Sequence, residues 1–368
     1  MNIVCDKSLL CAALDGVSKA VTTRSSIPVL EGVLLKAEGF QLTLTGYDLE
    51  MGIITTIEAN VRQPGDIVLN AKLLGDMVRR MPSGEVSIVV DDTGNTTIQG
   101  GVAQFEIQSM LGSEYPDLPN TGAERTLTMK AGELRDMIAR TLYAVSQDDK
   151  KPAHTGELFE IEPDHLTMVA LDGYRLAIVD RPITATKDIR VIVPAKTMTE
   201  VNRLLPDDDE AEVHICANRR FVVFMFGGYT IMTRLIEGEF LNYRNVIPAG
   251  CRTRVTVETK PFIETIERAS LIITERLKNP LRVSFADNRV NVRCQTNLGR
   301  VMDEFDAKVE GDSVEIGFNN RYLLDALRNA RTDKVVLEMN GPLSPVKMLP
   351  AEGNDFTYLV LPVRFKND

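Results

Sequence analysis

A threefold internal repeat with a period of about 125 residues most limits how this chain can fold. Three apolar stripes share the spacing i, i+4, i+7 and i+11, which is typical of one face of an α-helix. The stripes begin at Leu10, Leu134 and Phe262, so successive copies start 124 and then 128 residues apart. Their members are Leu10, Leu14, Val17 and Val21, then Leu134, Ile138, Thr141 and Val145, then Phe262, Ile266, Ala269 and Ile273. A period this long indicates tandem domains rather than a solenoid of short repeats.

A second element also occurs three times and reads as a short apolar strand that turns into a helix. It occupies residues 68–82, 191–206 and 316–330. Opposite charges four residues apart support an exposed helix face by roughly 0.2–0.5 kcal/mol. Each copy has such a pair near its helix start: Lys72 and Asp76, Lys196 and Glu200, Arg321 and Asp325.

Between these helices apolar and polar residues alternate, which predicts β-strands. The alternating runs are 40–45, 53–57, 86–90, 166–170, 213–217, 221–226, 283–292 and 335–339. Similar strands beginning at Phe105, Tyr229 and Phe356 end the three copies, and Gly227-Gly228 reads as a hairpin turn. We therefore predict an α+β fold of three tandem like domains, each with two helices and about eight strands. The predicted domains are 1–122, 123–250 and 251–368.

The composition indicates a cytoplasmic protein. No apolar run approaches the roughly 18 residues that a membrane-spanning helix needs. The first residues, MNIVCDKSLL, lack the basic and apolar segments of a secretory signal. The five cysteines are scattered, which is typical of reduced thiols in a cytosol.

The motifs of common enzymes are missing from the sequence. The three histidines, His154, His165 and His214, have no metal-ligand spacing among themselves or with cysteine. The sequence has no nucleophile elbow, phosphate-binding loop or dinucleotide fingerprint. Four consecutive acids at 207–210 could bind a hard cation, but their place after Pro206 at a helix end favours a solvated turn. We predict no catalytic residue, no metal site and no cofactor.

Charge is unevenly distributed along the chain. The net charge of −10 argues against nucleic-acid binding, because phosphate contacts need Lys and Arg. All six helical segments nevertheless carry more Lys and Arg than Asp and Glu, so the anions concentrate in the strands and loops. Exposed helices often carry such cations, which accounts for part of this pattern. If the six helices share one surface, that surface is basic.

Six segments together resemble the bacterial DNA polymerase III beta subunit family, the sliding clamps, over essentially the whole length. They are SSIPVLEGVLL (25–35), LTGYDLEM (44–51), LDGYRLA (171–177), GEFLNYRNVIP (238–248), EIGFNNRYLLDAL (315–327) and YLVLPVR (358–364). The resemblance implies that three domains form a crescent and that two crescents close head to tail into a homodimeric ring. Helices then line the hole and sheets lie outside. Such a ring encircles double-stranded DNA without sequence specificity and serves as a processivity factor in DNA replication.

The resemblance also implies two sets of interface residues. The DNA-facing cations are Arg24, Lys72, Arg79, Lys196, Arg203 and Arg321, of which Arg24 and Lys196 match the family and the others follow from helix position. The ring interface consists of Phe105 and Ile107 from the first domain and Leu271 and Ile272 from the third. Gln104 stands beside Phe105, so the sequence leaves open whether the ionic pairs that often support this interface are present.

A third implied site is an apolar groove that binds short linear peptides of the replicative polymerase, the clamp loader and repair proteins. Leu241 stands where the family often has proline, so peptide preference can differ. The groove comprises Leu171, Gly173, Arg175, Leu176, Leu241, Val246, Leu277, Asn319, Tyr322, Leu343, Ser344, Val346, Val360, Leu361, Pro362, Val363 and Arg364.

Two other classes of protein remain as alternatives at this point. One is a metal-dependent hydrolase that uses the acids at 207–210. The other is a cytosolic three-domain scaffold that does not bind DNA.

Overall fold

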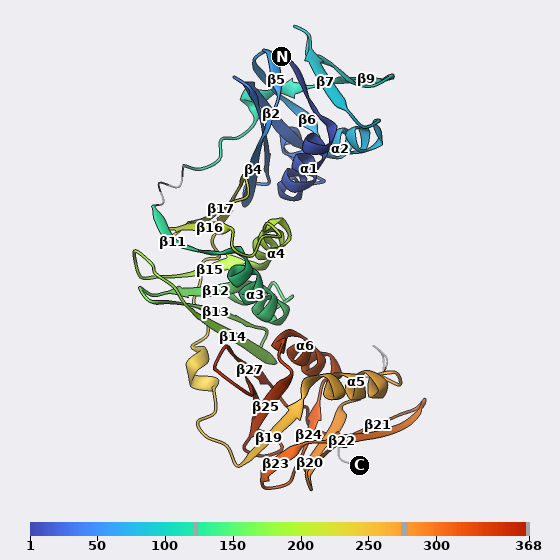
Figure 1. Ribbon diagram of the computed structural model, residues 1–368, viewed down its shortest axis with the longest axis vertical. Coiled ribbons are helices and arrows are strands. Elements are labelled where there is room, and N and C mark those ends of the chain that lie inside the picture. Colours follow the sequence, from blue (N-terminus) through green and yellow to red (C-terminus); the bar gives the residue numbers. More distant parts are fainter. Residues whose placement is uncertain (121, 123, 274–278, 366–368) are drawn as a thin grey trace. The chain divides into compact units, whose positions relative to one another are not determined.

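The computed structural model describes residues 1–120, 122, 124–273 and 279–365, in which helices and strands form the predicted α+β fold (Figure 1). The chain divides into two units, Met1–Glu133 with Thr199–Leu235 and Leu134–Met198 with Ile236–Asp368. The middle third of the chain therefore contributes to both units, and the predicted domain ends at 122 and 250 stay a prediction.

Each copy of the repeat supplies two of the six α-helices in the described residues. They are α1 (Lys7–Val17), α2 (Ala71–Arg80), α3 (Ala131–Thr141), α4 (Ala195–Leu204), α5 (Thr259–Ser270) and α6 (Asn320–Ala330). The predicted stripes are buried except at Val21 and Ile273, which follow the helix ends and are half-buried. In all three copies the last residue of the stripe lies beyond the end of the α-helix, so the stripes predicted helices about one turn too long. α1 packs beside α2, and α5 beside α6 (Figure 1).

Side-chain caps set several of these helix starts. The Asp6 carboxylate accepts from the backbone N–H groups of Ser8 and Leu9 at 2.8 and 3.1 Å. Asn70 accepts from Leu73 N–H, and Asn319 accepts from Arg321 N–H and Tyr322 N–H. These bonds satisfy donors that have no partner within the first helical turn.

Two antiparallel sheets build the first unit. The smaller has the strand order β5 (Asn60–Gln63), β1 (Asn2–Asp6), β7 (Glu85–Val90), β8 (Asn95–Gly100), β9 (Ala103–Gln108). The larger has the order β10 (Met110–Leu111), β6 (Gly65–Asn70), β2 (Gly32–Glu38), β3 (Gln41–Tyr47), β4 (Met51–Glu58), β18 (Tyr229–Arg234), β17 (Phe221–Phe226), β16 (Glu212–Ala217), β11 (Arg125–Lys130).

Two antiparallel sheets also build the second unit. The larger has the order β15 (Ile189–Pro194), β12 (Gly156–Ile161), β13 (His165–Leu171), β14 (Arg175–Pro182), β27 (Phe356–Val360), β26 (Val346–Pro350), β25 (Lys334–Met339), β19 (Thr253–Glu258), β23 (Lys308–Gly311). The smaller has the order β22 (Gly299–Asp306), β21 (Arg289–Thr296), β20 (Leu281–Ala286), β24 (Val314–Phe318).

Each large sheet contains one join between successive copies of the repeat. In the first unit β4 pairs with β18, so that Ile53 lies opposite Ile231. In the second unit β14 pairs with β27, so that Leu176 lies opposite Leu359. All four side chains are buried, and their burial adds hydrophobic free energy to the backbone hydrogen bonds of the join.

Two local sequence predictions were wrong. The alternating run at 283–292 is not one strand, because Asp287 and Asn288 form a tight turn between β20 and β21 with φ of 52° and 56°. Asp and Asn tolerate this left-handed conformation better than most residues. The acid of the α2 pair was also misassigned, since Asp76 contacts Arg79 and Arg80 at 3.1 and 3.3 Å.

One carboxyl group lies inside the core of the second unit. Glu157 on β12 is fully buried, and its Oε2 has no hydrogen-bond partner among the described residues. The Thr141 hydroxyl lies 2.5 Å from Glu157 Oε1 and 2.8 Å from the Met137 carbonyl oxygen. One hydroxyl proton cannot serve both acceptors, whereas a protonated Glu157 can donate to Thr141. Burial raises the pKa of Glu157 to about 8, although the bond from Thr141 opposes the shift.

The raised pKa of Glu157 predicts a pH-dependent stability. Between the ordinary carboxyl pKa and pH 8 the folded state holds a proton that the unfolded state releases, so the stabilising contribution is complete below about pH 4.5 and is lost as pH rises to 8. We expect Glu157→Gln to flatten this loss and to unfold at higher denaturant concentration than the unsubstituted protein at pH 8. Urea unfolding at several pH values measures both effects. If the urea midpoints of the two proteins changed with pH in the same way, Glu157 would not be neutral in the folded state.

Candidate functional site

The C-terminal segment after β27 is bound to two other parts of the second unit. Leu361 N–H donates to the Tyr174 carbonyl oxygen at 2.9 Å, and Val363 N–H donates to the Gly317 carbonyl oxygen at 2.8 Å. Leu361 and Pro362 are half-buried, whereas the next two residues are exposed. The predicted groove residues at the chain end therefore lie between the β13–β14 turn and β24.

The β13–β14 turn forms one side of this region. The Asp172 carboxylate accepts from Tyr174 N–H at 2.9 Å and from Arg175 N–H at 3.1 Å. Gly173 has a φ of 92°, a conformation that favours glycine. A Cβ atom at this position would have open space around it, with no contact within 4 Å. The turn presents Tyr174, which is 60% exposed and stacks on Tyr322 of α6 with ring centroids 5.9 Å apart. Tyr174 was missing from the prediction, although an aromatic residue beside a turn glycine was a usable signal.

Arg175 connects the turn to α6 and is largely buried. Its Nε contacts Asp172 at 3.0 Å and its Nη1 contacts Asp325 at 2.6 Å. The guanidinium also lies 4.7 Å from the ring centroid of Tyr322. The planar fork of Arg is suited to holding two carboxylates and one aromatic face together. Arg175 thus fixes the wall of the candidate groove, and its donors face the protein.

The apolar groove residues fall into two groups. Leu171 and Leu176 belong to a buried cluster with Phe240, Tyr243 and Leu359. Val346 and Val360 are buried as well, on opposite positions of β26 and β27. The exposed members are Leu241, Val246, Leu343 and Val363. The second group offers the most surface to a ligand, the half-buried Leu361, Pro362 and Tyr322 offer less, and the first group is buried beneath them.

The segment that carries Leu241 and Val246 is held by the buried cluster and by one carboxylate. Phe240 and Tyr243 are buried, and the Tyr243 hydroxyl donates to Glu160 Oε2 at 2.6 Å. Arg244 contacts the same carboxylate at 2.7 Å, and Arg190 contacts it at 3.2 Å. Burial would raise the pKa of Glu160, but the bonds from Arg244 and Tyr243 hold it below the ordinary value.

Two further predicted members of the groove, Asn319 and Ser344, are polar residues. The Asn319 side-chain oxygen caps α6, so the polar atom that it can offer to a peptide is its amide nitrogen. Ser344 is half-buried in the loop before β26, where its N–H lies 3.4 Å from the Gly341 carbonyl oxygen. Leu277 lies outside the described residues.

The candidate DNA-facing cations differ in the ion pairs that they form with carboxylates of the protein. Arg79 contacts Asp15 at 3.0 Å and Asp76 at 3.1 Å, and Asp15 raises its pKa further. Arg203 contacts Glu200 at 2.8 Å. Arg24 and Lys72 are exposed, and within the described residues no carboxylate lies within 4.0 Å of either. Lys196 and Arg321 lie on α4 and α6 and also make interactions of their own.

The candidate ring residues lie at the edges of the two smaller sheets. In the described part of the chain β9 and β22 each have a hydrogen-bonded neighbour on one side only. Phe105 and Ile107 are half-buried on one face of β9. Leu271 follows α5 and is 82% exposed, and Ile272 beside it is half-buried.

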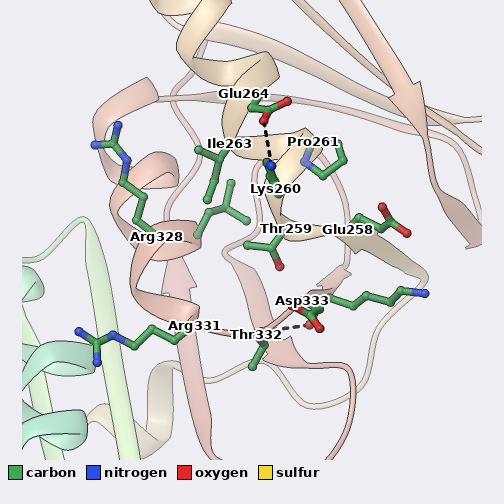
Figure 2. Close-up of a pocket in the computed structure, with 12 residues that line it drawn as sticks. Glu258, Thr259, Lys260, Pro261, Ile263, Glu264, Arg328, Arg331, Thr332 and Asp333 are labelled. Carbon is green, nitrogen blue, oxygen red and sulfur yellow. Dashed lines mark hydrogen bonds and ion pairs between the residues drawn. The ribbon is translucent and has the colours of Figure 1, made fainter.

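A hollow of about 800 Å³ lies between the start of α5 and the end of α6 (Figure 2). Cations and acids share its lining, and Lys260 lies 4.0 Å from Glu264. The guanidinium groups of Arg328 and Arg331 point away from Thr259 at its centre (Figure 2). This mixture of charges does not select an anion or a cation. The hollow contains none of the predicted groove residues.

The described residues do not place a metal site at the four consecutive acids. Within the described part of the chain the acids at 207–210 do not converge, and the one cluster with metal-ligand geometry is Glu162, Asp164 and His165 on the exposed β12–β13 turn. Both ring nitrogens of His165 face carboxylates, at 2.7 and 3.3 Å, and the bond to Asp164 raises its pKa. Among the helices described, none combines the length and apolar character needed to span a bilayer.

Comparison with known proteins identifies one family along the chain. Models for the N-terminal, central and C-terminal domains of the DNA polymerase III beta subunit match residues 1–119, 128–242 and 244–364. The chain is 31% identical to the beta sliding clamp of Halalkalibacterium halodurans, with 99% of this chain and 100% of the relative covered. It is 32% identical to the beta sliding clamp of Synechocystis sp., with both chains fully covered. The crystal structure of the DNA polymerase sliding clamp from Bacillus subtilis aligns with a TM-score of 0.96 at 28% identity and 100% coverage of both chains.

The two-carboxylate contact of Arg175 predicts a specific cost of substitution. Lys can reach one carboxylate but cannot hold both, so Arg175→Lys should lower the free energy of unfolding by roughly 1–3 kcal/mol. Arg62→Lys, on an exposed position of β5, is the matched control and should leave stability unchanged. Urea unfolding of the three proteins measures the difference. Equal stability of Arg175→Lys and the control would mean that the bridge contributes nothing.

Proposed function

The chain belongs to the DNA polymerase III beta subunit family, and from this premise we propose that two copies close into a ring around duplex DNA. The ring is a sliding clamp, which tethers the replicative polymerase and other replication and repair proteins to DNA. It acts in the cytoplasm as a mechanical tether, without catalysis or a cofactor. A scaffold that never touches DNA is not favoured, because relatives that match the whole chain are named sliding clamps.

The strand topology supports the ring more than any other observation. β4, β14 and β22 occupy the same place in the three copies of the repeat, and so do β9, β18 and β27. Within the chain β4 pairs with β18, and β14 pairs with β27. Each join thus pairs a strand of the first set with a strand of the second set from the next copy. This pattern leaves β22 of the third copy and β9 of the first copy without a partner strand from another copy. We infer that β22 of one protomer pairs with β9 of the next, which repeats the internal joins head to tail.

Burial at equivalent positions supports the same join. Phe105 and Ile107 are the third and fifth residues of β9. The third and fifth residues of β18 are Ile231 and Thr233, and those of β27 are Tyr358 and Val360. These four residues of the internal joins are buried, whereas Phe105 and Ile107 are half-exposed. Leu271 and Ile272 supply apolar surface from the third domain. An exposed apolar strand edge is a liability for a monomer, so a partner strand is the natural cover.

A closed ring retains DNA by topology, so it needs only weak contacts to the backbone. Cations on the helices attract phosphates without reading base edges, which leaves the ring able to slide. Arg24 and Lys72 are our first candidates for these contacts, and Lys196 on α4 and Arg321 on α6 are further candidates. Arg79 and Arg203 contribute less in this proposal, because each already contacts a carboxylate.

The groove in the second unit is the docking site for short partner peptides. Leu241, Val246, Leu343 and Val363 offer exposed apolar surface, and Tyr174 adds an aromatic wall. Asn319, Ser344 and Arg364 supply polar contacts that fix peptide direction. Each protomer of three domains, with ends at 122 and 250, carries one groove.

A charge on the β9 edge should prevent ring closure. We expect Ile107→Lys to yield a folded monomer at micromolar concentration, because the buried join would have to desolvate an ammonium group. Val102→Lys is the control, since this residue is fully exposed at the end of the same hairpin. Light scattering gives the mass of each variant. A dimer mass for Ile107→Lys would place the interface elsewhere.

Charge reversal at the candidate DNA-facing cations should weaken retention on DNA. We expect Arg24→Glu with Lys72→Glu to lower the amount of clamp retained on primed circular DNA several-fold at moderate salt, because phosphate attraction is lost. Arg62→Glu with Arg219→Glu makes the same change in net charge at exposed positions that are not predicted to face DNA, and it should have little effect. Gel filtration of the loaded circles measures retention, and linearised DNA should release all variants. Equal loss from both pairs would point to overall charge rather than to these residues.

A further inference from the structure

The last described residue of the chain, Phe365, is packed against the third domain although chain ends usually fray. The guanidinium carbon of Arg282 lies 4.0 Å from the centroid of the Phe365 ring. This distance is well within the range of a cation–π interaction. Phe365 is half-buried, so the ring contact continues the attachments that Leu361 and Val363 make through their backbone N–H groups.

The surface that receives the ring is a cross-strand pair. Arg282 on β20 lies directly opposite Gly317 on β24. A Cβ atom at position 317 would lie 2.3 Å from the Val363 carbonyl oxygen and 2.9 Å from the Phe365 ring. The tail can therefore approach β24 because residue 317 has no side chain. The Arg282 guanidinium also lies 3.5 Å from Glu315, one strand over.

These contacts hold the tail at three successive points. The first is at the β13–β14 turn, the second is at the backbone of β24, and the third is the Phe365 ring. Leu361–Arg364 lie between the first and third points, and these residues form part of the candidate groove. If the third point is released, the backbone hydrogen bond from Val363 to Gly317 is the attachment to β24 that remains among the described residues.

We propose that Phe365 is a positioning residue, a latch whose ring on Arg282 and Gly317 keeps the C-terminal tail in its peptide-binding conformation. The inference rests on the proposed function of the groove. When the tail is latched, the peptide binds a preformed surface. The apparent affinity for the peptide is proportional to the fraction of molecules in which the tail is latched. Phe365 does not itself need to touch the peptide.

The test compares Phe365→Ala, Phe365→Tyr and Gly317→Ala with a matched control, Phe40→Ala. Phe40 is an exposed phenylalanine in the β2–β3 turn of the other unit. Amide hydrogen exchange at Leu361 and Val363 reports tail order. Fluorescence anisotropy with a labelled short Gln- and Leu-containing peptide reports affinity, and thermal unfolding reports global stability.

We expect Phe365→Ala to speed exchange at Val363 and to weaken peptide binding about tenfold, with global unfolding unchanged. Gly317→Ala should act in the same direction by displacing the tail. Phe365→Tyr keeps the ring and should bind as the unsubstituted protein does, and Phe40→Ala should be silent in both assays.

Unchanged exchange at Val363 in Phe365→Ala would overturn the latch. Faster exchange with unchanged peptide affinity would overturn its role in the groove. If the unsubstituted protein does not bind the peptide, the groove itself is refuted. The exchange rates then decide separately whether the ring holds the tail.

Discussion

Antiparallel pairing between successive copies of the repeat is the interaction on which the rest of this structure depends. The β4–β18 join makes one nine-stranded sheet of two shorter ones, and the β14–β27 join does the same in the second unit. Each join buries apolar side chains while satisfying the backbone groups of two strands that would otherwise be edges. The groove residues depend on the second join, because it brings the chain end beside the β13–β14 turn.

The sequence predicted the helices and most strands because their burial has a simple period. It failed where a local conformation interrupts that period without a glycine or proline, as at Asp287 and Asn288. It also misassigned the partner of Asp76, because Lys72 and Arg80 both lie four residues from this acid and the spacing alone does not choose between them. One partner of Asp325 is Arg175, which is 150 residues away in the sequence, and no local pattern contains such a pair.

The candidate groove could be predicted as a set of segments but not as a surface. Leu171, Val346 and Val360 have the same apolar character as Leu343 and Val363, yet the first three are buried in the sheet and the last two are exposed. Which residues reach solvent depends on what packs against each face, and that is settled by strands distant in sequence. Tyr174 is the converse case, because its exposure follows from the tight turn that Asp172 caps.

The two open strand edges have a consequence for assembly that goes beyond the number of protomers. A head-to-tail contact forms a closed ring only if the rotations at all joins add up to a full turn, and otherwise it extends into a filament. In the proposed ring, two of the three joins per protomer lie inside the chain, at β4–β18 and β14–β27. The twist of the two sheets that contain these internal joins therefore affects closure of the ring as much as the contact between protomers does. A core substitution far from the open edges can turn a finite assembly into an endless one without weakening any contact between subunits.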